Sequence, residues 1–176
     1  TNLEALGEST SPATGLSMIR LRQSQRGAPV FQGELRALVD SKGRLVRTVG
    51  RLVPGLSTVS AAPARLLEPI PAVRGLLRGA GIEAENAIIE TDSIDSGGKS
   101  WTAEAGAVLT RPLRASLVYF PLAPGVVAPA WPAVLMTRGE ADWYVLVDAV
   151  HGSLLYRKNL RTQASTQPAR FSVYTQ

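Results

Sequence analysis

The chain has no cysteine and a single histidine, His151, among its 176 residues. The absence of cysteine excludes disulfide bonds, thiolate metal sites and thiol catalysis. It does not decide the compartment, because many secreted bacterial proteins also lack disulfides. Whatever this chain does, it does without sulfur chemistry.

Long uninterrupted hydrophobic runs are also missing. The uncharged stretch around residues 126–136 contains Pro129 and Pro132, so it is too short and too broken to span a bilayer. We therefore expect no membrane span. The chain opens on Thr1 without a charged segment followed by an apolar one, which predicts a processed or deliberately cut product from which a secretion signal could have been removed.

Positive charge is in excess, with 19 basic and 14 acidic residues and a pI of about 10.1. The basic residues are scattered, and aromatic residues make up only 6% of the chain. Nucleic-acid modules usually add stacking aromatics, so we expect no nucleic-acid partner. Arg20 and Arg22 alternate with apolar residues, which predicts a strand with both arginines on its solvent face. A positive module would be steered toward an acidic partner surface.

Two segments, residues 38–46 and 146–155, share one pattern. In each, apolar residues lead to an aspartate, Asp40 or Asp148, and a glycine follows before a second apolar stretch. An aspartate carboxylate can accept hydrogen bonds from backbone N–H groups further along, and glycine adopts the positive φ of a tight turn. Both segments are predicted to be β-hairpins, and the pair suggests two related modules.

The N-terminal part is predicted to be an antiparallel meander. Residues 1–12 have no periodicity and are expected to form a loose lead-in. Alternating segments then predict three strands, at residues 18–25, 30–39 and 44–52. Pro54 and Gly55 end the third strand, so a module boundary is expected near this point.

The C-terminal part is predicted to combine a helix with a curled sheet. Val73, Leu76 and Leu77 lie at helical spacing, and Pro71 fits the first turn of a helix. Further antiparallel strands are expected at residues 115–122, 133–137, 143–147 and 153–159. The predicted fold class is therefore α+β, an antiparallel meander followed by a cystatin-like module with one helix on an antiparallel sheet.

Candidate chemical groups are few. His151 lies three residues after Asp148 in a predicted turn, and no serine partner for a triad is identified. Asp92 and Asp95 superficially suggest a calcium loop, but Ile94 stands where an oxygen ligand belongs. Trp131 and Trp143 are better explained by packing than by a ligand pocket. We predict no catalytic, metal or cofactor site.

One block of the sequence resembles a known family. Residues 18–34 read MIRLRQSQRGAPVFQGE, in which a strand ending in glutamine precedes a Gly-x-Pro-Val-Phe turn. The hairpin at Asp40 and the segment Gly50-Arg51-Leu52 follow. This block is similar to the fungalysin/thermolysin propeptide (FTP) motif. The pattern of tryptophan, aspartate and tyrosine in residues 115–159 more loosely resembles the PepSY-like second half of the same prosegments.

The resemblance implies a non-catalytic propeptide region. It would act as intramolecular chaperone and inhibitor of a secreted zinc metalloendopeptidase of the fungalysin type, with the peptidase domain in cis as partner. The His-Glu-x-x-His helix that would hold zinc is absent from this chain, so we predict that the chain is not an enzyme. The alternative is a secreted stand-alone FTP/PepSY binding or scaffold module with no peptidase attached.

These interpretations divide the chain into three parts: an FTP-like module at residues 1–56, a PepSY-like module at 57–162, and a linker toward a further domain at 163–176. Partner contacts are predicted on the exposed arginines of the first module and on the polar tail. The residues are Arg20, Arg22, Leu160, Arg161, Arg170, Phe171 and Tyr174.

Overall fold

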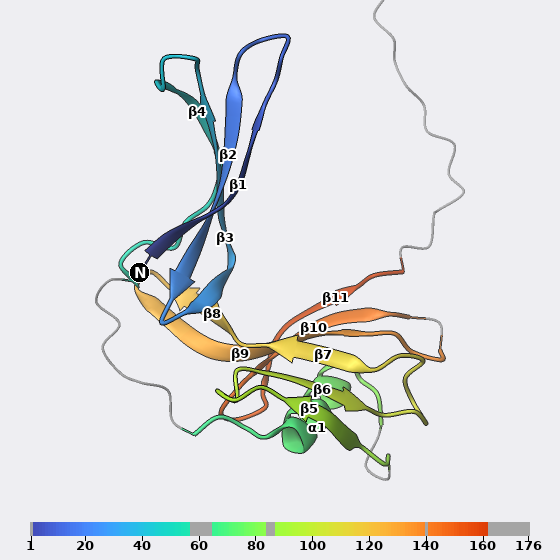
Figure 1. Ribbon diagram of the computed structural model, residues 1–176. Coiled ribbons are helices and arrows are strands. Elements are labelled where there is room, and N and C mark those ends of the chain that lie inside the picture. Colours follow the sequence, from blue (N-terminus) through green and yellow to red (C-terminus); the bar gives the residue numbers. More distant parts are fainter. Residues whose placement is uncertain (1, 57–64, 84–86, 140, 162–176) are drawn as a thin grey trace, which may run out of the picture.

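A computed structural model describes residues 2–56, 65–83, 87–139 and 141–161 of the chain. Its first part is an arm of four antiparallel strands that stands away from the rest of the molecule (Figure 1). The strands are β1 (Asn2–Thr10), β2 (Ser17–Gln25), β3 (Ala28–Val39) and β4 (Leu45–Gly50). They lie in the order β1-β2-β3-β4, and every residue of β1 and β4 is exposed.

The second part, the body, contains the remaining elements. The strands β8 (Val118–Ala123), β9 (Val126–Leu135), β10 (Trp143–Asp148) and β11 (Leu154–Asn159) form an antiparallel sheet. Val30 of β3 pairs in parallel with Tyr119 of β8, which joins the arm and these strands into one mixed sheet of eight strands. A separate three-stranded sheet contains β5 (Glu90–Ile94), β6 (Ser100–Glu104) and β7 (Leu113–Ser116).

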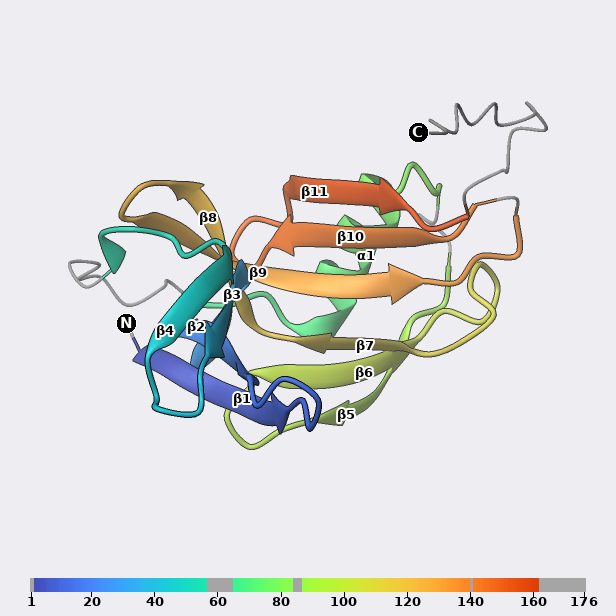
Figure 2. The same ribbon diagram turned by 90° about the horizontal axis from the view of Figure 1, so that it is seen from above.

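The hydrophobic core lies around the helix α1 (Pro69–Gly79). Ala72, Val73, Leu76 and Leu77 have no exposed surface, and the helix packs against β10 and β6. A Cβ on Gly75 would come within 3.0 Å of the carbonyl oxygen of Gly152, so the helix lies very close to the β10–β11 turn. Because β7 runs beside β9, the two sheets curl together around α1 (Figure 2).

The predicted fold class is wrong. The described residues form eleven strands and one helix of 11 residues, with a mixed eight-stranded sheet, so the chain is mostly sheet and contains no helix-on-sheet module. Two physical reasons account for the error. Pro69 begins the helix and Gly81, with a φ of 76°, follows its end, so the leucine-rich segment yields three turns only. Residues 90–104, for which no pair of strands was predicted, form the hairpin of β5 and β6.

The loose lead-in predicted at residues 1–12 is also wrong, because Asn2–Thr10 form β1. This strand pairs along its length with β2, and the pairing shifts between Ala5 and Gly7. All nine residues are exposed, so no alternation of apolar and polar residues marks the strand in the sequence.

Both predicted hairpins are confirmed. Asp40 Oδ1 accepts hydrogen bonds from the N–H groups of Lys42 and Arg44, and Asp148 Oδ1 accepts them from Val150 and His151. The helical face of Val73, Leu76 and Leu77 is confirmed as well. The module boundaries at residues 56 and 162 stay predictions. Within the described part of the chain, no helix is long and apolar enough to cross a membrane.

Candidate functional site

Four aromatic rings form a cluster on the face of the body sheet that points away from α1. Phe31 of β3 lies with its ring centroid 5.5 Å from Phe120, 5.4 Å from Tyr156 and 6.2 Å from Tyr144. Tyr144 and Tyr156 are 6.2 Å apart in an edge-to-face arrangement. Aromatic pairs at these separations attract one another beyond simple burial. All four residues are only half-buried, so part of each ring faces solvent.

The surroundings of Tyr144 change the pKa of its hydroxyl. Burial of its hydroxyl, with a smaller contribution from Tyr156, raises the pKa of Tyr144 above its usual value. Its hydroxyl is neutral at physiological pH and can donate a hydrogen bond. A phenol of this kind beside apolar rings is typical of residues that anchor protein interfaces.

Charged side chains form a ladder on one face of the arm. Arg22 Nη2 donates to Glu4 Oε2 at 2.9 Å, and Arg20 Nη2 lies 3.6 Å from Glu34 Oε2. Arg22 is opposite both Glu4 and Glu34 in the strand register. About half of the Arg20 side chain is exposed, so the pair that it forms contributes little to stability and can exchange partners.

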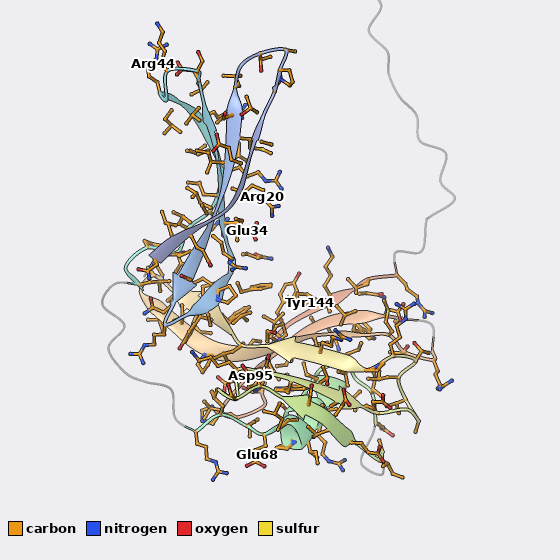
Figure 3. The ribbon with its side chains drawn as sticks, in the orientation of Figure 1. Arg20, Glu34, Arg44, Glu68, Asp95 and Tyr144 are labelled. Atoms are coloured by element: carbon orange, nitrogen blue, oxygen red, sulfur yellow. The ribbon has the colours of Figure 1, made fainter. Side chains whose placement is uncertain are left out.

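The charged ladder and the aromatic cluster face a common corner. Arg20 and Glu34 lie on the side of the arm that looks over the body, and Tyr144 lies on the body below them (Figure 3). We call this the corner surface, formed by Arg20, Arg22, Phe31, Phe120, Tyr144 and Tyr156. It combines arginine, tyrosine and phenylalanine, which are residue types enriched where proteins bind one another.

The bend between arm and body depends on residues within the segment 18–34. The Gln23 side-chain amide donates to the carbonyl of Val53 and accepts from its N–H, both at 2.8 Å. It thus makes the two backbone hydrogen bonds that a neighbouring strand would otherwise make. Gln32 has a φ of 57°, and a Cβ on Gly33 would meet Val30 Cβ at 3.0 Å. The register between β2 and β3 shifts here, between Arg22 and Ser24. The block therefore shapes the joint that positions Phe31.

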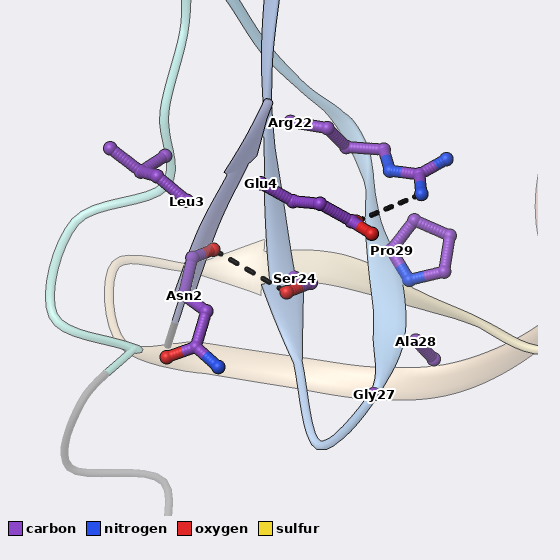
Figure 4. A pocket seen from close by; sticks show the side chains of 8 residues that line it. All are labelled: Asn2, Leu3, Glu4, Arg22, Ser24, Gly27, Ala28 and Pro29. Carbon is purple, nitrogen blue, oxygen red and sulfur yellow. Dashed lines mark hydrogen bonds and ion pairs between the residues drawn. The ribbon is translucent and has the colours of Figure 1, made fainter. Parts of the chain in front are cut away.

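A hollow of about 770 Å³ lies at the base of the arm (Figure 4). The pair Arg22–Glu4 spans part of it, and Ser24 Oγ donates to the carbonyl of Asn2 at 3.4 Å. Its only carboxylate is already paired with Arg22, and no base lies beside Ser24 among its lining residues, so the hollow has no catalytic pair. The lining residues are Asn2, Leu3, Glu4, Arg22, Ser24, Gly27, Ala28 and Pro29.

His151, Asp148 and Asp95, which the sequence offered as candidate chemical groups, form hydrogen bonds within turns. His151 Nδ1 lies 3.1 Å from Asp148 Oδ1, which also accepts two backbone N–H groups, so the histidine closes its own turn. Asp95 Oδ1 accepts from the N–H groups of Lys99 and Ser100, and Gly98 N donates to the Asp95 carbonyl. Among the described residues, no cluster of three or more histidine, aspartate or glutamate side chains could hold a metal ion.

The predicted partner contacts are placed unevenly. Arg20 and Arg22 belong to the corner surface. Leu160 is 42% exposed, whereas Arg161 is engaged within the chain: its guanidinium binds both carboxylate oxygens of Asp142, at 2.7 and 3.1 Å, and the carbonyl of Gly139. Arg170, Phe171 and Tyr174 lie outside the described residues. Contact with a partner stays a prediction for all seven residues.

The Arg161–Asp142 pair predicts a pH-dependent stability. Hydrogen bonds from Arg161, with a further one from the Thr137 N–H, hold the pKa of Asp142 below its ordinary value. A carboxyl whose pKa is lower in the folded state stabilises the fold above about pH 4, the unfolded value, and loses this contribution as the pH falls through the folded value. Asp142→Asn should therefore be less stable than the wild type near neutral pH, and the difference should shrink in acid.

Urea unfolding at a series of pH values measures this. Glu104→Gln, at an exposed carboxyl on β6 without an ion pair among the described residues, is the matched control. A difference between Asp142→Asn and the wild type that stayed constant down to strong acid would contradict the assigned role of the pair.

The aromatic cluster was missed by sequence reasoning. Phe31, Phe120, Tyr144 and Tyr156 are far apart in the chain, and each sits in an alternating strand where an aromatic residue is unremarkable. One signal was present: Tyr144 and Tyr156 flank the predicted Asp148 hairpin and face each other diagonally across it. Sequence reasoning did detect the arginines of the ladder, through their alternation.

Comparison with known proteins yields little. No protein-family model matches the sequence, and no curated protein matches it either. Among solved structures, the chain is similar to the Bacillus megaterium YpeB C-terminal domain, with a TM-score of 0.40 and 7% sequence identity. The match covers 91% of this chain and 57% of that one, so the chain spans less than two thirds of its neighbour's length. This similarity is too low to carry over a function.

Proposed function

We propose that this chain is a non-catalytic protein-binding region that serves as the prosegment of a secreted zinc metalloendopeptidase. The observation that carries the binding role is the corner surface, where half-buried aromatic rings, the exposed Arg20 and the half-buried Arg22 meet at a bend. The narrower assignment to a peptidase rests on the resemblance of residues 18–34 to the FTP motif.

The corner surface suits a folded partner better than a small ligand. Its charged ladder lies on the arm, and its aromatic rings lie where the arm meets the body. Because the arm and the body diverge from this point, the surface is open (Figure 3). Partially exposed tyrosine and phenylalanine offer large contact area at low cost in side-chain entropy, and arginine adds directional hydrogen bonds. A partner seated there would cover both at once.

A prosegment needs no further chemistry. If it binds the native peptidase and not the unfolded chain, it stabilises the native state by mass action, which assists folding. The same interface inhibits the enzyme when it holds a segment of the prosegment across the substrate cleft. Inhibition and chaperone action then end together when the prosegment is removed.

The test begins with the reading frame beyond Gln176 and asks whether it encodes a His-Glu-x-x-His motif. If so, residues 1–176 added in trans should inhibit that peptidase in a dose-dependent way and raise its refolding yield. A reading frame without this motif, or a peptidase unaffected by the added chain, would contradict the prosegment role and favour the stand-alone binding module.

Within that assay, Arg20→Glu and Tyr156→Ala should each weaken inhibition by about tenfold or more, because both remove a contact of the corner surface. Arg114→Glu on β7 is the matched control, since it makes the same charge change at an exposed strand position in the other sheet. Thermal unfolding of each variant separates lost binding from lost folding. Equal inhibition by all three variants would place the interface elsewhere.

A further inference from the structure

The strand β4 is an open edge of the arm. Its six residues are all exposed, and Leu45, Val46 and Val49 are 63, 55 and 55% exposed. On one side β4 pairs with β3, and on its other side no described strand pairs with it. An exposed edge with apolar side chains is a template for a further strand.

The register identifies the backbone groups that this edge offers. The N–H of Arg51 donates to the carbonyl of Glu34, and Gly50 is opposite Leu35. In an antiparallel ladder this makes Gly50–Leu35 a non-hydrogen-bonded pair and Val49–Arg36 a hydrogen-bonded one. Thr48, opposite Ala37, then directs its N–H and carbonyl outward, where an added strand would bind them.

The charge of the hairpin at residues 34–51 is strongly positive. It carries five basic and two acidic residues; Asp40 lies beside Arg44 at 2.8 Å, and Glu34 lies 3.6 Å from Arg20 in a half-exposed pair. Arg36 and Arg47 share one face of the hairpin, on neighbouring strands, and neither forms an ion pair with a described residue. The edge therefore presents unneutralised cations next to its apolar side chains.

We propose that β4 accepts an extended acidic peptide segment as an additional strand. Main-chain hydrogen bonds to Thr48 would supply binding, and carboxylates of the peptide would neutralise Arg36 and Arg47, which share a face with Val49. The alternating apolar residues of the peptide would then lie on the opposite face, that of the Thr48 side chain. Arg36 lies opposite Arg20 in the register, so the carboxylates would lie on the face that carries the charged ladder, but the strand itself would add at the outer edge of the arm. The inference does not depend on the peptidase assignment.

Two other occupants fit less well. A second copy of this chain, paired antiparallel about Thr48, would place Arg47 opposite Val49 and would leave the cations of both edges unneutralised. A single-stranded nucleic acid would meet the cations but would find aliphatic side chains at the edge instead of stacking aromatics. An acidic peptide satisfies the charge, the apolar groups and the backbone together.

The affinity test uses the whole 176-residue chain and two labelled peptides, one alternating valine with glutamate and the other valine with lysine, measured by fluorescence anisotropy. The glutamate peptide should bind at least about tenfold more tightly. Arg47→Glu should remove most of this preference, whereas the control Arg114→Glu should retain it. Equal binding of the two peptides, or full binding to Arg47→Glu, would overturn the proposal.

Hydrogen exchange distinguishes strand addition from simple charge attraction. On addition of the glutamate peptide, the amide of Thr48 should become protected while that of Val49, already bonded to β3, changes little. Unprotected Thr48 in the saturated complex would overturn the proposal. Two further results would overturn it. One is a Thr48 amide that is already protected without peptide in a chain that sediments as a dimer. The other is displacement of the bound peptide by an oligothymidine at a concentration below that of the peptide.

Discussion

Replacing Trp131 with alanine should lower the free energy of unfolding by about 3–5 kcal/mol, because a large side chain would be removed from a filled core. Trp131 is 1% exposed and packs edge-to-face against Trp101, with ring centroids 5.6 Å apart. It lies on β9 opposite Val147 of β10, which is also fully buried. Loss of its ring would weaken both sheets around α1.

Chemical denaturation of Trp131→Ala and of the wild type measures the effect. Trp143→Ala is the matched control, since Trp143 is only half-buried and its ring contacts the Arg157 guanidinium at 5.0 Å. The control should cost markedly less, about 1–2 kcal/mol. If the two variants lost the same stability, the Trp131 ring would not be packed in the core as described.

Replacing Gly50 with alanine should lower the stability by about 2–3 kcal/mol, with the damage confined to the arm. A Cβ at this position would lie 2.2 Å from the carbonyl oxygen of Glu34 and 3.0 Å from Leu35 Cα, and Gly50 has a φ of 131°. Both contacts are backbone atoms, so the clash cannot be relieved by a change of side-chain rotamer. The pairing of β4 with β3 must open at this end.

Gly43→Ala is the control for this prediction. Gly43 also has a positive φ, of 76°, but nothing lies within 4 Å of a Cβ placed on it. That variant bears the conformational cost alone, about 1 kcal/mol. Amide exchange in β4 should accelerate strongly in Gly50→Ala and only slightly in Gly43→Ala. Unchanged exchange in Gly50→Ala would show that the Gly50–Glu34 approach is not as tight as described.

Partners bound at the corner surface and at the β4 edge, as proposed above, would cover much of the exposed arm. A strand such as β4, with every residue exposed, gains little from burial, so its stability depends on backbone pairing and on turns such as that at Asp40. Hydrogen bonds from Arg44 and Lys42 lower the pKa of Asp40 and keep this carboxylate ionised as a turn acceptor. The arm is thus held open by local interactions, which leaves its surfaces available to a partner.

Local interactions are what the sequence by itself determined. The hairpins at Asp40 and Asp148 were predictable because an aspartate, the N–H groups that it binds and the following glycine lie within five residues of one another. The buried face of α1 was predictable because helical periodicity is local too. The alternation that exposes Arg20 in β2 belongs to the same class.

Only the tertiary structure decided what depends on partners far apart in the chain. Asn2–Thr10 become a strand because β2 supplies their hydrogen bonds, and the parallel contact of Val30 with Tyr119 turns two predicted units into one mixed sheet. The same contact places Phe31 against Phe120 and Tyr156, which creates the corner surface. Sequence periodicity reports which face of an element is apolar, but it carries no information about which distant element covers that face.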